Sequence, residues 1–167
     1  MKIISHRGNL KGKNPNLENT KHYIDSALIE GFDVEVDLWK IDEDYYLGHD
    51  MPENKVELEW LDKRKKKIWL HTKNFSCFES LLNLNDDFIF FYYTIEPVVM
   101  VSNRVIWSHV PTEMSVYKNC VIPLLKKSQI IKNNFFGWYG ICTDFPTLLN
   151  NKLSVSRKNN SEEQRIF

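Results

Sequence analysis

Residues 31–38 read GFDVEVDL, and this stretch decides the fold that the sequence predicts. Side chains of a β-strand alternate between its two faces, so Asp33, Glu35 and Asp37 share one face and the aliphatic residues between them share the other. On an exposed sheet this is ordinary polar patterning. Inside a barrel the same acids would repel one another unless a cation neutralised them, and paired carboxylates suit Mg²⁺ or Ca²⁺. The stretch therefore indicates either a solvated face or a metal site.

Strand-length apolar runs recur along the rest of the chain and alternate with helical or linking segments. A helix is predicted between the first run and residues 32–38, with Asn16 or Asn19 as its cap, and further helices are predicted over Phe75–Leu84 and Pro97–Val101. This alternation favours a parallel α/β sheet. The other six runs are Lys2–Ser5, Lys67–Leu70, Phe88–Tyr93, Arg104–Trp107, Cys120–Leu124 and Gly140–Thr143.

A (β/α)₈ or TIM barrel fits this order of elements, but such barrels usually need about 250 residues, and this chain has 167. We therefore expect a compact, incomplete TIM barrel of the α/β class. Either short loops replace some helices, or a strand is missing between Cys120 and Cys142. Residues 1–150 are predicted to form a single barrel domain, followed by a polar helix or tail over 151–167.

The bulk composition restricts the possible partners. Lysine plus arginine and aspartate plus glutamate both total 22, so no overall field attracts nucleic acid, and we expect no nucleic-acid partner. The three cysteines lack metal-type spacing and suit a reducing compartment. No run of about 18 apolar residues and no leader pattern is present, so no transmembrane segment is expected and a cytoplasmic location is predicted.

Two short segments place histidines beside predicted strand ends. ISHRGN contains His6, Arg7 and Gly8, and YYLGHD contains His49 and Asp50. A histidine in a surface turn explains either segment alone. Together with the acids of residues 31–38, however, two histidines supply what acid–base chemistry on a phosphoester needs, one to take a proton and one to give it.

The order of these motifs resembles the glycerophosphodiester phosphodiesterase family. HRGN (6–9), LENT (17–20), GFDVEVDL (31–38) and LGHD (47–50) occur in the family's order, and YGICTDFPTLL (139–149) is similar to its last strand. The resemblance is specific over about the first 50 residues. It implies a metal-dependent TIM barrel that cleaves a small-molecule glycerophosphodiester to an alcohol and glycerol phosphate, either directly or by way of a cyclic phosphate.

The resemblance also implies roles for individual residues. His6 and His49 become the general acid and base, Glu35 and Asp37 become metal ligands, and Arg7 becomes a phosphate contact. These roles agree with the chemistry of the residues, since a metal neutralises phosphate oxygens while histidines transfer protons.

Residues 67–74, KIWLHTKN, depart from the family's pattern. The resemblance implies a metal-binding glutamate, one residue and then a lysine, but the glutamate is replaced by His71. Lys73 matches and is predicted to bind substrate phosphate, as is Asn19, while Glu18 lines or braces the site. His71 is predicted to be the third metal ligand. Alternatively, the two carboxylates and waters hold the metal, and His71 contacts those ligands or the substrate. Mg²⁺ or Ca²⁺ is the expected cofactor, and Mn²⁺ or Zn²⁺ is favoured instead if His71 is a ligand, because imidazole is neutral and softer than carboxylate.

Two alternatives to a hydrolase stay open. The short chain and the missing carboxylate fit a catalytically silent barrel that binds a phosphorylated ligand, and a phospholipase D-like lyase is the third hypothesis. Asp144 either supports the site through a hydrogen bond or caps the turn at Pro146. His109 follows an apolar run and could reach the barrel mouth, but it is interpreted as a polar loop residue. Tyr93 is interpreted as a core residue that could also wall a pocket.

Overall fold

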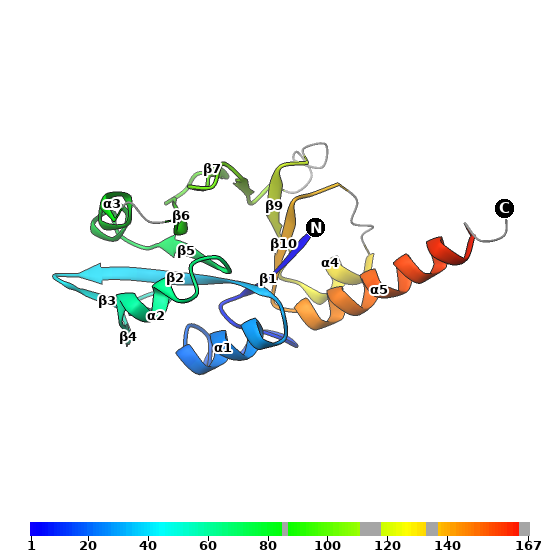
Figure 1. The fold of residues 1–167 in the computed structure, drawn as a ribbon, viewed down its shortest axis with the longest axis horizontal. Helices are drawn as coiled ribbons and strands as arrows, with labels where there is room; N and C mark the ends of the chain where they lie inside the picture. Colours follow the sequence, from blue (N-terminus) through cyan, green and yellow to red (C-terminus); the bar gives the residue numbers. More distant parts are fainter. Residues whose placement is uncertain (85–86, 111–117, 133–136, 164–167) are drawn as a thin grey trace.

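Figure 1 shows the computed structural model, which describes residues 1–84, 87–110, 118–132 and 137–163, with side chains as far as 155. The helices are α1 (Lys21–Ile29), α2 (Leu58–Asp62), α3 (Phe75–Asn83), α4 (Lys127–Lys132) and α5 (Pro146–Glu163). The strands are β1 (Lys2–His6), β2 (Asp33–Ile41), β3 (Asp44–Leu47), β4 (Asn54–Val56), β5 (Ile68–Thr72), β6 (Ile89–Tyr92), β7 (Val98–Met100), β8 (Ile106–Ser108), β9 (Cys120–Pro123) and β10 (Gly140–Thr143). Within the described ranges these ten strands form one sheet.

Seven of these strands run parallel, in the order β6-β5-β2-β1-β10-β9-β8. The sheet curls around its own axis, as Figure 1 shows. A complete TIM barrel has eight parallel strands and is closed. Here no ladder between described residues joins β6 to β8, and the antiparallel β7 follows β8 at that edge. The fold is therefore an incomplete TIM barrel of the α/β class, as the sequence predicts.

The two faces of the parallel strands carry different side chains. On the outside, Val36 of β2 lies in one buried cluster with Ile24 of α1 and Leu81 of α3. On the inside, large apolar side chains fill the barrel. The fully buried Trp69 is the largest of them, and truncating it to alanine is expected to cost about 3–5 kcal/mol. The inner cluster consists of Ile4, Trp69, Phe91, Val101, Val105, Trp107, Val121 and Cys142.

Two predictions about the second half of the chain are wrong. Pro97–Val101 is no helix, because Val98–Met100 pairs with Ile106–Ser108 as an antiparallel strand. β-branched Val98 and Val99 suit a strand, and the partner lies only a short loop away. The suggestion of a missing strand between Cys120 and Cys142 also fails, since β9 and β10 pair directly in parallel.

The start of α1 differs from the prediction as well. Thr20, rather than Asn16 or Asn19, is the N-cap, although its hydroxyl donates to Leu17 and makes no capping bond to the helix. Asn19 instead adopts a left-handed backbone with φ of 57° and directs its side chain toward Asp37. Asn19, which was expected to cap the helix, therefore forms a hydrogen bond to Asp37 inside the barrel.

A hairpin that the sequence does not predict carries the loop with His49. β2 continues past the barrel to Ile41, and β3 and β4 pair antiparallel beside this extension. The loop 48–53 connects those two strands. Among the described helices none is both long and apolar enough to cross a bilayer.

Candidate active site

The polar side chains singled out in the sequence meet at one end of the barrel, where the parallel strands have their carboxyl ends. His6 pairs in register with Glu35, and Asp37 pairs with His71 on the next strand. Register and alternation together direct these side chains inward from β1, β2 and β5. Active sites of TIM barrels lie at this end of the barrel.

Asp33, the third acid of residues 31–38, does not join this group. Lys2 Nζ lies 2.6 Å from its Oδ2, and the indole nitrogen of Trp69 donates to the same oxygen at 3.1 Å. Asp33 is thus neutralised near the other end of the barrel.

Asp37 is the most heavily contacted residue of the site. Its Oδ2 lies 2.8 Å from Arg7 Nε and 3.0 Å from Asn19 Nδ2, while its Oδ1 lies 3.0 Å from His71 Nδ1 and 3.3 Å from Lys73 Nζ. Burial alone would raise the pKa of Asp37, but the His71 hydrogen bond and the charges of Arg7 and Lys73 lower it. Asp37 is therefore an anion held by hydrogen bonds from Asn19 and His71 and by ion pairs with Arg7 and Lys73.

Glu35 has the opposite environment. Burial and the charge of Asp37 raise its pKa to about 7. Its buried Oε2 has no hydrogen-bond partner in the described part of the chain and lies 3.9 Å from His6 Nε2. Leaving such an oxygen buried and unpaired is costly, so Glu35 is suited to meet a cation.

Glu35, Asp37 and His71 form a buried group that could hold a metal ion. One ligand atom from each lies within 4.8 Å of the others. Burial lowers the pKa of His71, which favours the neutral imidazole that ligation requires. The ring of His71 stacks on Phe91 at 5.2 Å and on Tyr93 at 4.3 Å between centroids, which fixes its plane. The unpaired oxygen of Glu35 and the neutral imidazole both fit a divalent cation.

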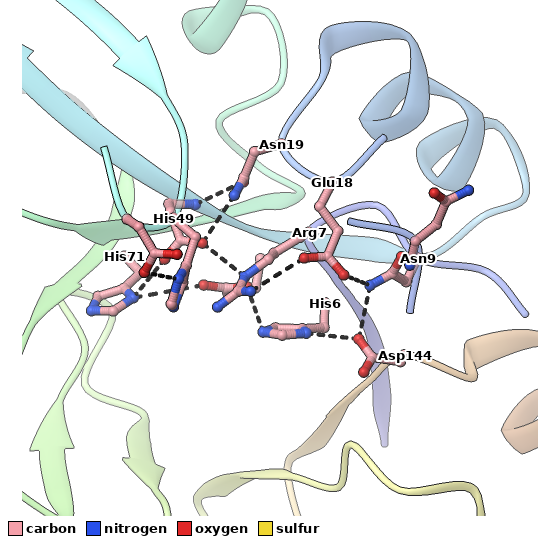
Figure 2. A network of polar contacts seen from close by, with 12 residues as sticks. His6, Arg7, Asn9, Glu18, Asn19, His49, His71 and Asp144 are labelled. Atoms are coloured by element: carbon pink, nitrogen blue, oxygen red, sulfur yellow. Dashed lines mark hydrogen bonds and ion pairs between the residues drawn. The ribbon is translucent and has the colours of Figure 1, made fainter. Parts of the chain in front are cut away.

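His6 belongs to a second set of contacts, on the β10 side of the site. Its Nδ1 lies 2.7 Å from Asp144 Oδ1, and Asn9 donates to the same oxygen at 2.9 Å. Asn9 also donates to Glu18, which in turn pairs with Arg7 at 3.2 Å, so these five residues belong to the network in Figure 2. Burial alone would lower the pKa of His6, but the Asp144 hydrogen bond and the Glu35 charge raise it.

His49 lies at the rim of the site and is solvent-exposed. Its Nδ1 contacts Asp50 Oδ1 at 2.7 Å. The preceding Gly48 has φ of 155°, and a Cβ there would lie 2.1 Å from the carbonyl oxygen of Met51, so the loop requires glycine. A polar hollow of about 340 Å³ connects this rim to the site and is lined by Arg7, Lys13, Pro15, Glu18, Asn19, His49, Asp50 and Glu53.

The structure brings seven of the eight predicted site residues into direct contact around the two acids and leaves His49 at the rim. The seven are His6, Arg7, Asn19, Glu35, Asp37, His71 and Lys73. Asn9 was missed, although it stands inside the quoted HRGN motif. Of the two interpretations of Asp144, the structure shows the hydrogen bond to the site.

Comparison with solved structures identifies the architecture. A crystal structure of glycerophosphodiester phosphodiesterase from Agrobacterium tumefaciens str. C58 is similar with a TM-score of 0.53 at 15% identity, over 89% of this chain and 98% of that chain. This chain has the fold of a glycerophosphodiester phosphodiesterase. A candidate glycerophosphodiester phosphodiesterase from Galdieria sulphuraria has a TM-score of 0.48 at 15% identity, over 92% and 97% of the two chains. No protein-family model and no curated protein matches the sequence.

The glycerophosphodiester phosphodiesterase fold agrees with the placement of the motifs. HRGN ends β1, the acids lie on β2, and the threonine–aspartate pair ends β10. The likeness is one of fold at low identity, and a fold by itself does not determine the chemistry of a site.

Proposed function

We propose that the chain is a metal-dependent phosphodiester hydrolase that cleaves glycerophosphodiesters. The observation that carries the proposal is one juxtaposition: the buried group of Glu35, Asp37 and His71 lies 3.9 Å from a histidine that is itself paired with a buried aspartate. A charge-neutralising centre and a positioned proton carrier are the two parts that phosphodiester cleavage needs.

Glu35, Asp37 and His71 would hold the divalent metal. When bound, the metal neutralises the nonbridging phosphate oxygens and the charge that develops on them in the transition state. Arg7 and Lys73 are both anchored on Asp37, which places two fixed cations beside the same centre. They would orient the phosphate and add to its electrostatic stabilisation. Asn19 braces Asp37 and lines the hollow through which substrate reaches this centre.

His6 would transfer one of the two protons that the reaction moves. Asp144 accepts from Nδ1, so Nε2 faces Glu35 and the site. This arrangement fixes the ring and favours its protonation. The proposed step forms a bond from phosphorus to the attacking oxygen, breaks the bond from phosphorus to the leaving oxygen, and delivers a proton to the departing alcohol.

His49 would take the complementary role at the rim. Its hydrogen bond to Asp50 resembles that of His6 to Asp144 but lies in solvent. The attacking oxygen is either water or a neighbouring hydroxyl of the substrate, and the second route gives a cyclic phosphate. In both cases one histidine removes a proton and the other supplies one.

One observation favours the alternative of a silent barrel that binds a phosphorylated ligand. The two oxygens of Asp37 already meet two hydrogen-bond donors and two cations, so Arg7 and Lys73 neutralise much of the negative charge. A phosphorylated ligand could bind those cations without any metal.

Phosphorus NMR of a glycerophosphodiester incubated with the purified protein decides between these functions. Mg²⁺, Ca²⁺, Mn²⁺ and Zn²⁺ are supplied in turn, with chelator as control. Glycerol phosphate that forms only with metal supports the hydrolase, and a cyclic phosphate as the final product supports a lyase. Tight ligand binding with no turnover under any metal supports the silent barrel and contradicts the proposal.

A further inference from the structure

We propose that Tyr93 and His109 bind one arm of the phosphodiester, an uncharged arm that carries hydroxyl groups, and that they thereby determine which alcohols the site accepts. The inference rests on the proposed function, because that function places the phosphate beside His71 and Lys73.

The two residues face the site from the edge where the barrel is incomplete. Tyr93 follows β6 and lies on the same face as Phe91, and His109 follows β8. The ring of Tyr93 stacks nearly parallel on His71 at 4.3 Å and meets His109 at 4.7 Å with a tilt of 55°. Tyr93 therefore contacts the candidate metal ligand His71 directly, and His109 contacts Tyr93.

Both side chains offer hydrogen-bonding groups that no other described residue uses. The hydroxyl of Tyr93 and the ring nitrogens of His109 make no hydrogen bond with the part of the chain that the structure describes. A phenol both donates and accepts, and a neutral imidazole has one donor and one acceptor. His109 is solvent-exposed, and its backbone donates to the carbonyl of Pro97 at 2.8 Å, which anchors the segment that carries it. Both groups are thus open to a ligand, as a subsite for hydroxyls requires.

The described strands on this side of the site carry little charge. Strands β6, β7 and β8 contain no ionisable acid or base other than tyrosine. The carboxylate of Glu96, in the next loop, accepts from the backbone amides of Thr94 and Ile95. By contrast, the hollow on the Arg7 side includes Lys13 and Glu53. A charged arm would find partners in that hollow, whereas the Tyr93 side suits a neutral one.

The ring contacts of Tyr93 also argue against binding of a substrate arm with a quaternary ammonium group on this side of the site. Such cations bind to open aromatic faces, but the ring of Tyr93 is already in contact with both His71 and His109. What Tyr93 presents to a ligand is its hydroxyl edge.

The test compares two monoesters of similar size, glycerol 3-phosphate and propyl phosphate, which differ in two hydroxyl groups. Calorimetric titration of each into the metal-loaded protein gives an affinity ratio that involves no turnover. We expect glycerol 3-phosphate to bind more tightly by about three- to tenfold per hydrogen bond made. Tyr93→Phe and His109→Phe keep both rings and are expected to bring the ratio toward one. Tyr92→Phe is the control and should leave the ratio unchanged, because Tyr92 is the last residue of β6 and its ring contacts Phe78 of α3 on the opposite face.

The results separate this inference from the proposed function. Equal affinities in the wild type, or an unchanged ratio in both Tyr93→Phe and His109→Phe, overturn the subsite even if the protein hydrolyses phosphodiesters. A preference that Tyr93→Phe removes supports the subsite, and it does so even if phosphorus NMR shows no hydrolysis and the hydrolase proposal fails.

Discussion

The Nδ1 atom of His71 lies 3.0 Å from Oδ1 of Asp37, and the two residues occupy paired positions on β5 and β2. A carboxylate only accepts hydrogen bonds, so in the absence of metal this nitrogen carries the proton. To bind a metal through Nδ1, a neutral His71 must move that proton to Nε2. An imidazolium cannot ligate, and the carboxyl of Glu35, whose pKa is raised to about 7, must be ionised to do so. Metal affinity should therefore fall as the pH is lowered.

Replacing His71 by the carboxylate that the family resemblance implies should change the metal preference. The wild type is expected to favour Mn²⁺ or Zn²⁺ over Mg²⁺ or Ca²⁺, and His71→Glu should raise Mg²⁺ affinity by about tenfold, or about 1.4 kcal/mol. Calorimetric titration of each metal measures the change. His22→Glu, on the exposed side of α1, is the control and should have no effect. Unchanged Mg²⁺ affinity in His71→Glu would exclude His71 from the metal site.

Glu35 should make the metal-free protein less stable as the pH rises. Its folded pKa, about 7, is above the ordinary value of 4.5, so the folded state binds the extra proton between those values. Stability is therefore lost across that window at up to about 1.4 kcal/mol per pH unit. Chemical denaturation in chelator should show this slope in the wild type and a flatter one in Glu35→Gln.

The matched control for that experiment is Glu79→Gln, an exposed position on α3. It should retain the wild-type slope. Parallel stability curves for the wild type and Glu35→Gln would show that the pKa of Glu35 is the same in the folded and unfolded states, and would contradict the buried, unpaired carboxyl.

Asp144→Asn should impair turnover through His6 alone. The amide cannot stabilise the charged imidazole, so the pKa of His6 should fall and the limb of the pH–rate profile that reports it should move to lower pH. A loss of about 100-fold in kcat is expected, at the lower end of what positioned acid–base groups contribute. Metal affinity should not change. Asp42→Asn, in an exposed turn, is the isosteric control, and equal pH profiles for the two variants would contradict the role of Asp144.

Gly48→Ala should displace the loop that carries His49. A Cβ at Gly48 would meet the carbonyl of Met51 at 2.1 Å, whereas one at Gly31 would meet nothing within 4 Å. Both glycines have positive φ, so Gly31→Ala measures backbone strain alone, at about 1 kcal/mol. Gly48→Ala should lose activity while still binding metal, and Gly31→Ala should keep its activity. Full activity in a folded Gly48→Ala protein would argue against a role for His49.

The strand of residues 31–38 could be predicted because period-two alternation is a local signal. The same rule, applied to residues 67–74, places His71 and Lys73 on one face, as observed. These local patterns, with the order of the motifs, are enough to indicate the barrel and the group of acids.

The rest depends on contacts that no local pattern contains. His6 and Asp144 are 138 positions apart and meet only because β1 pairs with β10. Residues 98–100 become a strand because β8 is beside them, so tertiary pairing overrides the helical interpretation. Tyr93 could have been noticed, because it shares the inward face of its strand with Phe91, but its stacking on His71 follows from the register of β5 and β6.

The most direct test of the account is a crystal structure of the protein soaked with Mn²⁺, with the ion located by anomalous scattering. We expect one strong peak with oxygens of Glu35 and Asp37 and a nitrogen of His71 within about 2.0–2.6 Å. A peak elsewhere, or no peak at a Mn²⁺ concentration that supports turnover, would contradict it.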